Sequence, residues 1–271
     1  MVLERLRLDG KVAVVTGAGP GLGQQMALAL AEAGADVVCA ARTREQIEAT
    51  AEAVRALGRR AIAVPTDVRD SAQCDALIQA CVDEFGRIDI MLSNAGIGDA
   101  RGTNRELWDV SDDDWHDALD VNLSSAFYCG RAASKAMIDR GQGGVIISVA
   151  SGTALRAYTQ NFAYGAAKAG VIALTKTMAV MLVRYGIRVN CIIPGFVAQR
   201  PAGAVEAYDH AMQGIARYIP VQRVGEAWEL GPLAVYLASE ASSYVTGQGF
   251  IIDGGGLAGG VAPVGFAPEV G

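Results

Sequence analysis

The sequence predicts one α/β domain built on a doubly wound parallel sheet, and three observations lead to this prediction. Short apolar segments alternate with longer amphipathic ones over most of the 271 residues, which is the pattern of consecutive β–α–β units. The apolar segments are continuous runs, as expected for strands covered on both faces. A glycine-rich turn, residues 17–23, directly follows the first run. We interpret residues 1–271 as a single domain, because no linker or internal repeat divides them.

Each element has a local reason in the sequence. Apolar runs predict strands over 12–16, 36–41, 61–64, 88–93, 145–147, 187–193 and 250–252. Amphipathic segments predict helices from the glycine turn to Gly34 and over 43–57, 70–86, 111–140, 162–185 and 226–239. Thr43 and Gln46 have the spacing of a capping box, and Ser111 with Asp114 is expected to cap the long helix. We expect a polar loop over 97–110, loops and short helices over 196–225, and an irregular C-terminal tail over 256–271.

Composition excludes several classes of function. The net charge is −6 and no run of Lys or Arg occurs, so nucleic acid and anionic membranes are not expected partners. Apolar runs are interrupted before they reach a membrane-spanning length, and the N-terminus lacks a secretory core. The five cysteines form no C-x-x-C pair, which favours free thiols and a cytoplasmic location. Two isolated histidines predict no metal site.

A tyrosine and a lysine near the middle of the chain suggest chemistry on a carbonyl or an alcohol. Tyr164 and Lys168 are four residues apart, so they share one face of the helix predicted over 162–185. A nearby ammonium favours the phenolate and moves the phenol pKa toward neutrality. The hydroxyl of Ser151, in the preceding loop, could hydrogen-bond a substrate oxygen as charge develops on it. The alternative is a surface helix that carries both residues by chance.

The glycine turn lies where a nucleotide-binding fold needs it, between the first strand and the first helix. Glycine allows a tight turn and a close approach of phosphates to the helix N-terminus, although a plain strand–helix connection uses the same residues. The second strand ends at Ala41-Arg42, where an acid would bind the ribose of NAD and an arginine suits the 2′-phosphate of NADP. We therefore favour NADP over NAD. The alternative is that Arg42 is a solvated arginine at the start of a helix and has no part in cofactor binding. Asp67-Val68 and Asn94-Ala95-Gly96, after the next two strands, are candidates for the adenine and the ribose or nicotinamide.

The pair Tyr164-x-x-x-Lys168 and the turn Thr16-Gly17-x-x-x-Gly21-x-Gly23 together resemble the short-chain dehydrogenase/reductase family. The similarity is to compact single-domain members, including the 3-oxoacyl-carrier-protein reductases, and extends from about Lys11 to Gly255. The resemblance implies a three-layer doubly wound Rossmann fold with a seven-stranded parallel sheet. It also implies an NAD(P)(H)-dependent oxidoreductase that interconverts a carbonyl and a secondary alcohol, and a homotetramer in which the long helices pack between subunits.

The resemblance also implies roles for individual residues. Tyr164 becomes the general acid/base, Ser151 the residue that orients the substrate oxygen, and Lys168 the partner of Tyr164 and of the nicotinamide ribose. Asn122, in Asp-Val-Asn-Leu, matches the family's active-site asparagine, which supports a proton-relay water. The alternative interpretation is that Asn122 only kinks the long helix. The cofactor contacts predicted from the motifs and the resemblance are Gly17, Gly19, Gly21, Leu22, Gly23, Arg42, Asp67, Val68, Asn94, Ala95, Gly96, Tyr164, Lys168, Pro194, Gly195 and Val197.

The chain also departs from the family pattern. Four to five residues after Pro194-Gly195 the family often has a threonine that binds the cofactor carboxamide, where this chain has Val197-Ala198-Gln199-Arg200, with Gln199 as a candidate substitute. The substrate, a small carbonyl or alcohol, is expected to be shaped by the loop over 97–110, the segment 154–162 and a lid over 196–222. Five aromatic residues in these regions are candidates for an apolar pocket: Tyr158, Phe162, Phe196, Tyr208 and Tyr218.

Other functions were compared with this one. A serine hydrolase is not predicted, because no G-x-S-x-G nucleophile turn occurs. The main rival is a catalytically silent nucleotide-binding sensor or scaffold on the same fold, and a second is an epimerase or dehydratase that uses the same cofactor. The joint presence of Asn122, Ser151, Tyr164 and Lys168 argues against the sensor. The compact length and the glycine spacing favour simple oxidoreduction over the epimerase or dehydratase.

Overall fold

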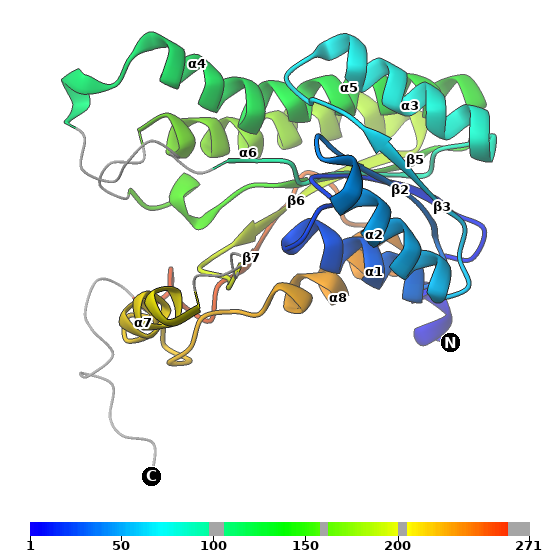
Figure 1. The fold of residues 1–271 in the computed structure, drawn as a ribbon. Coiled ribbons are helices and arrows are strands. Elements are labelled where there is room, and N and C mark those ends of the chain that lie inside the picture. The colour runs from blue at the N-terminus through cyan, green and yellow to red at the C-terminus, as the bar shows by residue number, and fades with distance from the viewer. Residues whose placement is uncertain (98–105, 158–161, 200–204, 260–271) are drawn as a thin grey trace.

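The structure is a computed structural model, and it describes residues 1–97, 106–157, 162–199 and 205–259. Seven parallel strands form one sheet in the order β3-β2-β1-β4-β5-β6-β7 (Figure 1). Their bounds are β1 (Val12–Thr16), β2 (Asp36–Ala41), β3 (Ala61–Pro65), β4 (Ile90–Ser93), β5 (Gly144–Val149), β6 (Ile187–Pro194) and β7 (Gly249–Ile252). The predicted sheet is confirmed. Because the order reverses between β1 and β4, a crevice is expected where these two strands end.

Helices cover both faces of the sheet (Figure 1). On one face lie α1 (Leu22–Glu32), α2 (Arg44–Ala56) and α8 (Gly231–Ala238); on the other lie α3 (Ser71–Phe85), α5 (Ser125–Arg140) and α6 (Phe162–Leu182). Strand residues alternate between the two cores: Ala13 and Val15 face α1 and α2, while Val12 and Val14 face α3 and α5. Both faces of each central strand are therefore buried, which explains the continuous apolar runs.

The helix predicted over 111–140 is present in the structure and contains one turn of π-helix. It begins as predicted, with the Ser111 hydroxyl accepting a hydrogen bond from the Asp114 N–H (3.2 Å). The segment α4 (Asp112–Leu119) is followed by η3 (Asp120–Ser124), which is one turn of π-helix, and then by α5. Asn122 lies inside this turn, and its side-chain amide donates to the Ala118 carbonyl (2.9 Å), an acceptor that a regular helix gives to the backbone. The long helix is therefore confirmed, and it contains a π-helical turn at Asn122.

Two further local predictions differ from the structure. Thr43 is the N-cap of α2 but its side chain makes no capping hydrogen bond, so the predicted capping box with Gln46 is not formed. The region 196–225, expected to hold loops and short helices, contains the twelve-residue helix α7 (Val205–Ala216). The remaining short helices are η1 (Leu3–Leu6), η2 (Leu107–Asp109), η4 (Gly152–Ala154), η5 (Val183–Tyr185), η6 (Ala227–Leu230) and η7 (Glu240–Ser242).

A buried ion network closes the amino-terminal end of the sheet. The Asp89 carboxylate, just before β4, lies 2.6 Å from the Arg87 guanidinium and 3.0 Å from that of Arg140, and accepts the Val12 N–H at 2.9 Å. Burial alone would raise the pKa of Asp89, but the Arg87 guanidinium, the Val12 N–H and Arg140 together hold it below its usual value. The Asp89 carboxylate is therefore fully partnered, whereas Nε and Nη1 of Arg140 are buried without a hydrogen-bond partner among the described residues.

Candidate active site

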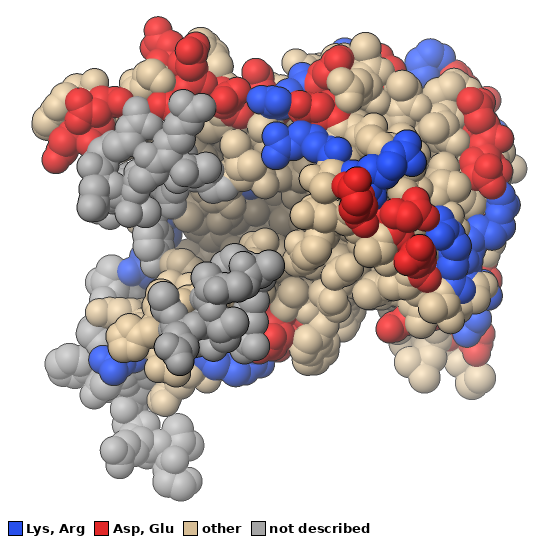
Figure 2. Space-filling model, in the orientation of Figure 1, with Lys and Arg blue, Asp and Glu red and all other residues tan. Residues whose placement is uncertain are grey.

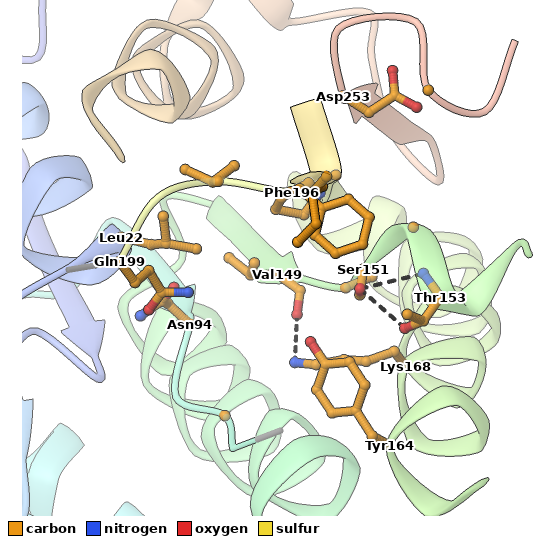
Figure 3. A pocket seen from close by; sticks show the side chains of 18 of the residues that line it. Leu22, Asn94, Val149, Ser151, Thr153, Tyr164, Lys168, Phe196, Gln199 and Asp253 are labelled. Carbon is orange, nitrogen blue, oxygen red and sulfur yellow. Dashed lines mark hydrogen bonds between the residues drawn. The ribbon is translucent and has the colours of Figure 1, made fainter. Parts of the chain in front are cut away.

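The opposite, carboxyl-terminal end of the sheet holds a cavity of about 900 Å³. Its walls come from the ends of β1, β4, β5 and β6, from η4 and α6, and from α7 and the segment after β7. Figure 2 shows it as a hollow in the face in view, and Figure 3 shows the residues around it. The position agrees with the switch point expected from the strand order.

The glycine turn after β1 forms one wall of the cavity. Gly17 has φ +62° and Gly21 has φ +118°, both in the region that favours glycine. A Cβ on Gly17 would lie 2.9 Å from both Ala95 Cα and Asn94 Nδ2, and one on Gly23 would overlap the Gly17 carbonyl oxygen. The close approach of these backbones therefore requires glycine, and it leaves a cradle at the N-terminus of α1 that fits the phosphates of a dinucleotide.

The end of β4 is tied to this turn. The Asn94 side-chain amide donates to the carbonyls of Thr16 (3.2 Å) and Gly17 (3.1 Å). The backbone N–H groups of Asn94 and Ala95 donate to the Thr16 hydroxyl, each at 3.2 Å. Asn94 thus fixes the turn, while Ala95 and Gly96 line the cavity with little side-chain volume. Thr16 has a part in this site that the sequence motifs alone did not assign.

Lys168 is a buried cation at the end of β5. The residue is 3% exposed, and its ammonium donates to the Val149 carbonyl at 2.9 Å. Burial lowers the pKa of Lys168 to about 8. Its Nζ lies 5.6 Å from the centre of the Tyr164 ring, and the Tyr164 hydroxyl points toward the ammonium (Figure 3). The predicted i, i+4 pair therefore meets at the cavity.

Ser151 faces the same part of the cavity from the loop after β5. Its Oγ accepts hydrogen bonds from the Thr153 N–H (3.3 Å) and the Thr153 hydroxyl (3.0 Å), because Ser151 is the N-cap of η4. With two bonds accepted, its own O–H is the donor that remains for an oxygen in the cavity. Thr153 orients this hydroxyl, and no motif pointed to it.

Asn122 is 1% exposed and, like Lys168, lies close to Gly96. Its amide donates to the Ile97 carbonyl (2.9 Å) and its Oδ1 accepts the Ile97 N–H (3.2 Å). A Cβ on Gly96 would lie 2.8 Å from Asn122 Oδ1 and 3.2 Å from Lys168 Nζ, so the two polar groups meet around the bare Cα of Gly96. The π-helical turn brings Asn122 to this position.

The residues predicted to bind the adenosine lie outside the walls of the cavity. Arg42 is exposed at the end of β2. Asp67 is paired with the Arg69 guanidinium at 2.6 Å, which lowers the pKa of its carboxyl. The Val68 side chain is buried in the core against α3, so only its backbone can meet a ligand. Gly19 and Gly21 belong to the glycine turn but do not line the cavity either. Gly19 lies against α2, since a Cβ built on it would be 2.9 Å from Gln46 Oε1.

The segment after β6 crosses over the cavity. Pro194, Gly195, Phe196 and Val197 line it, and Val197 is bridged to Gly225. Gln199 also lines the cavity, next to Leu22 and Asn94 (Figure 3). Its Oε1 lies 3.3 Å from the position of a Cβ on Gly21, so the side chain that replaces the family threonine reaches the glycine turn.

Of the five aromatic residues expected at the substrate side, Phe196 and Tyr218 line the cavity. Phe162 and Tyr208 are not among its described walls, although Tyr208 accepts the Gln199 N–H at 2.6 Å. Tyr158 lies outside the described residues. Ile97 and Arg156, which lie in segments expected to shape the substrate pocket, also line the cavity. The structure adds wall residues outside those segments that the sequence did not point to, including Pro20, Thr153 and Asp253.

Comparison with known proteins decides the family. A family model described as enoyl-(acyl carrier protein) reductase matches residues 17–256. The chain is 40% identical over 259 residues to 2-dehydro-3-deoxy-D-gluconate 5-dehydrogenase of Escherichia coli K12, covering 95% of this chain and 100% of that protein. The chain belongs to the short-chain dehydrogenase/reductase family. It is also 38% identical over 250 residues to 3-oxoacyl-[acyl-carrier-protein] reductase of Synechocystis, covering 92% of this chain and 97% of that one.

A solved structure supports the same assignment. Gluconate 5-dehydrogenase from Burkholderia cenocepacia, in complex with NADP and tartrate, superposes with a TM-score of 0.85 at 36% identity, over 95% of this chain and 99% of that one. The short-chain dehydrogenase/reductase fold predicted from the sequence is confirmed, and the chain is an NAD(P)-dependent oxidoreductase that acts on alcohol and carbonyl groups. These similarities give no support to a silent sensor.

Proposed function

We propose that this enzyme is an NADP(H)-preferring carbonyl reductase or secondary-alcohol dehydrogenase with Tyr164 as its general acid/base. The observation that carries the proposal is the convergence of Ser151, Tyr164 and Lys168 on one cavity beside the glycine turn. Bound NADP(H) supplies the hydride donor or acceptor. The cradle formed by Gly17, Gly21 and Gly23 fits its phosphates.

In the reducing direction, the Ser151 hydroxyl donates a hydrogen bond to the substrate oxygen. Tyr164 transfers a proton to the same oxygen. The Lys168 ammonium stabilises the phenolate that forms, because a cation in a water-poor cavity interacts strongly with a nearby anion. Burial already weakens the hold of Lys168 on its own proton, with a pKa of about 8. The Asn122 side chain would hold a water near Lys168 through which Tyr164 regains its proton.

The preference for NADP rests on the end of β2. The described residues there include Arg42 and Arg44 and no acid before Glu45. The free Thr43 side chain leaves the first-turn N–H groups of α2 without a side-chain cap, and a helix N-terminus flanked by guanidinium groups favours a phosphate. We propose that Arg42 binds the 2′-phosphate, that Asp67 and Val68 border the adenine, and that Asn94 to Gly96, Pro194, Gly195 and Val197 border the ribose and nicotinamide.

Cofactor titration tests this preference. We expect NADPH to bind the purified enzyme at least tenfold more tightly than NADH, and Arg42→Asp to reverse or abolish the ratio, because the carboxylate repels the phosphate and suits the ribose hydroxyls. Arg60→Asp, an exposed change at the opposite end of β3, serves as the control. An Arg42→Asp ratio equal to that of the wild type would remove Arg42 from the site.

Turnover of a mixed panel of ketones and secondary alcohols tests the activity itself. We expect oxidation of NADPH with at least one ketone or reduction of NADP⁺ with the matching alcohol. Tight cofactor binding without turnover on any chemically diverse substrate would favour the sensor instead. An epimerase or dehydratase would give product without net change in NADPH absorbance.

We also propose that the single domain assembles as a cytoplasmic homotetramer. Residues Phe162–Tyr185 form a helical segment long and apolar enough to cross a membrane, with only 28% of its most apolar stretch buried. Because this segment also carries Lys168 and packs on β6, a protein partner suits its apolar face better than lipid. Val180 (79% exposed) and Met181 (60%) on α6 and Phe127 (44%) on α5 offer apolar surface for subunit packing. All five cysteines are buried thiols, in keeping with a reducing compartment.

Light scattering of the purified protein tests the assembly. We expect a mass of four chains, and a mass of one chain would contradict the proposal.

Within each subunit we propose that residues 196–222, which include α7, form the lid over the substrate. Ala211, Gly214 and Ile215 of α7 already line the cavity. The tail over 256–271 lies mostly outside the described residues.

A further inference from the structure

Gln199, on the segment after β6, brings a carboxamide to the glycine turn. Its side chain lines the cavity beside Asn94 and Leu22, the first residue of α1 (Figure 3). Its Oε1 lies 3.3 Å from the position of a Cβ on Gly21, the N-cap of α1. Among the described residues the Gln199 side chain has no hydrogen-bond partner, so its amide is available to a ligand.

Hydrogen bonds fix the backbone of this segment. The Ala198 N–H donates to the Gly225 carbonyl (2.8 Å), and the Gly225 N–H donates to the Phe196 carbonyl (2.9 Å). The Gln199 N–H donates to the hydroxyl of Tyr208, on α7, at 2.6 Å. The Gln199 side chain therefore extends from a backbone that both the Gly225 segment and α7 hold in place.

The N-terminus of α1, where the Gln199 amide lies, offers donors to an anion. The first N–H groups of a helix have no acceptor within it, and the N-cap Gly21 has no side chain to accept them. In a doubly wound fold this helix N-terminus receives the pyrophosphate of a dinucleotide. The nicotinamide, by contrast, must lie beside Ser151 and Tyr164 for the proposed reaction. Figure 3 shows these two residues apart from Gln199.

We propose that the Gln199 carboxamide donates a hydrogen bond to the pyrophosphate of the bound cofactor, and that Tyr208 is a positioning residue that holds Gln199 for this contact. The inference rests on the proposed function and assigns one contact within its cofactor site. A glutamine amide stands further from its Cα than the hydroxyl of the family threonine, and here it reaches the glycine turn. Rotation of the amide turns its N–H donors toward an anion, and a hydrogen bond to a charged acceptor is stronger than one to a neutral group.

Cofactor fragments test which part of the cofactor Gln199 contacts. Calorimetric titration compares NADPH with 2′-phospho-ADP-ribose, which keeps the pyrophosphate but lacks nicotinamide, and with 2′-AMP, which lacks both. We expect Gln199→Ala to raise the Kd of the first two ligands by the same factor, about tenfold, and to leave the Kd of 2′-AMP unchanged. The kcat at saturating NADPH should not fall, because the nicotinamide keeps its own contacts. Gln79→Ala, which removes an exposed glutamine of α3 outside the cavity wall, is the matched control.

Tyr208→Phe tests the positioning role. Without the hydroxyl the Gln199 N–H loses its acceptor, and we expect the Kd of 2′-phospho-ADP-ribose to rise about threefold. The same change made in the Gln199→Ala variant should leave the Kd unchanged, because Tyr208 acts through the Gln199 side chain. A merely structural role of Tyr208 would weaken binding equally in both backgrounds.

Each contrary outcome has a distinct meaning. A loss confined to NADPH would assign Gln199 to the nicotinamide carboxamide, and unchanged Kd values in Gln199→Ala would remove it from the cofactor site, so either result overturns the inference. Equal effects of Tyr208→Phe in both backgrounds overturn the role of Tyr208. All three results leave the oxidoreductase proposal standing. Failure of the wild type to bind NADPH or NADH would overturn the proposed function, and this inference with it.

The test applies with either cofactor. If NADH binds the wild type more tightly than NADPH, then NADH, ADP-ribose and adenosine take the places of the three ligands, and the same ratios of Kd are expected.

Discussion

Asp89 and Lys168 are buried charges at opposite ends of the same sheet, and the protein surrounds them differently. Asp89, 4% exposed at the amino-terminal end, has two guanidinium partners and a backbone N–H. Lys168, 3% exposed at the carboxyl-terminal end, has one described hydrogen bond, to a neutral carbonyl. Accordingly the pKa of Asp89 is lowered in spite of burial, which favours its charged form, whereas burial lowers the pKa of Lys168, which disfavours its charged form.

The difference is the one expected between a structural charge and, under the proposed function, a charge that takes part in the reaction. A carboxylate surrounded by its own counter-ions is stabilised in the folded state and has no capacity left for a ligand. An ammonium that is buried with little compensation costs stability, and such a group persists where its chemistry is needed. The two ends of the sheet should therefore respond to mutation in opposite ways, and the following predictions test this.

The largest effect is expected from Tyr164→Phe. Removing the hydroxyl removes the proton donor and acceptor, so kcat should fall roughly 10³-fold, while the affinity for NADPH should change little because the ring remains. Steady-state kinetics and fluorescence titration of NADPH measure the two quantities. A Phe variant with wild-type kcat would mean that another group transfers the proton.

Asp89→Asn should act on stability and not on catalysis. Loss of the charge leaves Arg87 and Arg140 without their buried counter-ion, and we expect the free energy of unfolding to drop by about 3 kcal/mol with kcat at 25 °C nearly unchanged. Urea unfolding at pH 7 measures the loss, with the exposed Asp9→Asn as the control. Because the folded pKa of Asp89 is lowered, its contribution is present above pH ~4 and is lost as the pH falls through the folded pKa. A difference that is constant down to pH 2 would contradict this assignment.

A smaller effect is expected from Gly96→Ala. The new Cβ would approach Asn122 Oδ1 to 2.8 Å and Lys168 Nζ to 3.2 Å, and both are held by hydrogen bonds. We expect kcat to fall about tenfold to a hundredfold, because displacement of catalytic groups by less than an ångström is costly. Gly165→Ala, which neighbours Tyr164 but meets only an ordinary contact of 3.6 Å, is the matched control. Equal kcat values for the two variants would show that this space has no part in the reaction.

The sheet and the proximity of Tyr164 to Lys168 could be predicted because their signals are local. Continuous apolar runs such as Val145-Ile146-Ile147 identify strands buried on both faces, and the i, i+4 spacing of Tyr164 and Lys168 places both on one helical face. The glycine turn could be placed because it follows the first strand directly. Each of these features depends on residues that are close together in the chain.

Features formed between distant segments could not be predicted. Arg140 reaches Asp89 from 51 residues away, and Gln199, on the segment after β6, lies beside Gly21 in the turn after β1. The π-helical turn at Asn122 depends on the Ile97 backbone, which no helix pattern records. Thr43 has the right spacing for a capping box, yet its side chain does not cap the helix, because spacing alone does not determine the side-chain conformation. Arg156 lay within a segment expected to shape the substrate pocket, but its place in the wall required the turn of η4.

The most direct test of the comparison is urea unfolding of the wild type and Lys168→Met at pH 7 and pH 10, with kcat measured on the same samples. Between pH 8 and 10.5 the unfolded chain binds more protons than the folded one at this residue, so the wild type should gain stability as the pH rises. We predict that Lys168→Met is at least as stable as the wild type at pH 7. By pH 10 the free energy of unfolding of the wild type should have risen relative to that of the variant. The kcat of the variant should be at least 100-fold below that of the wild type. Lys135→Met, an exposed change on α5, should show no such pH dependence. A Lys168→Met variant that is destabilised at pH 7 as strongly as Asp89→Asn, or that keeps its kcat, would contradict the account.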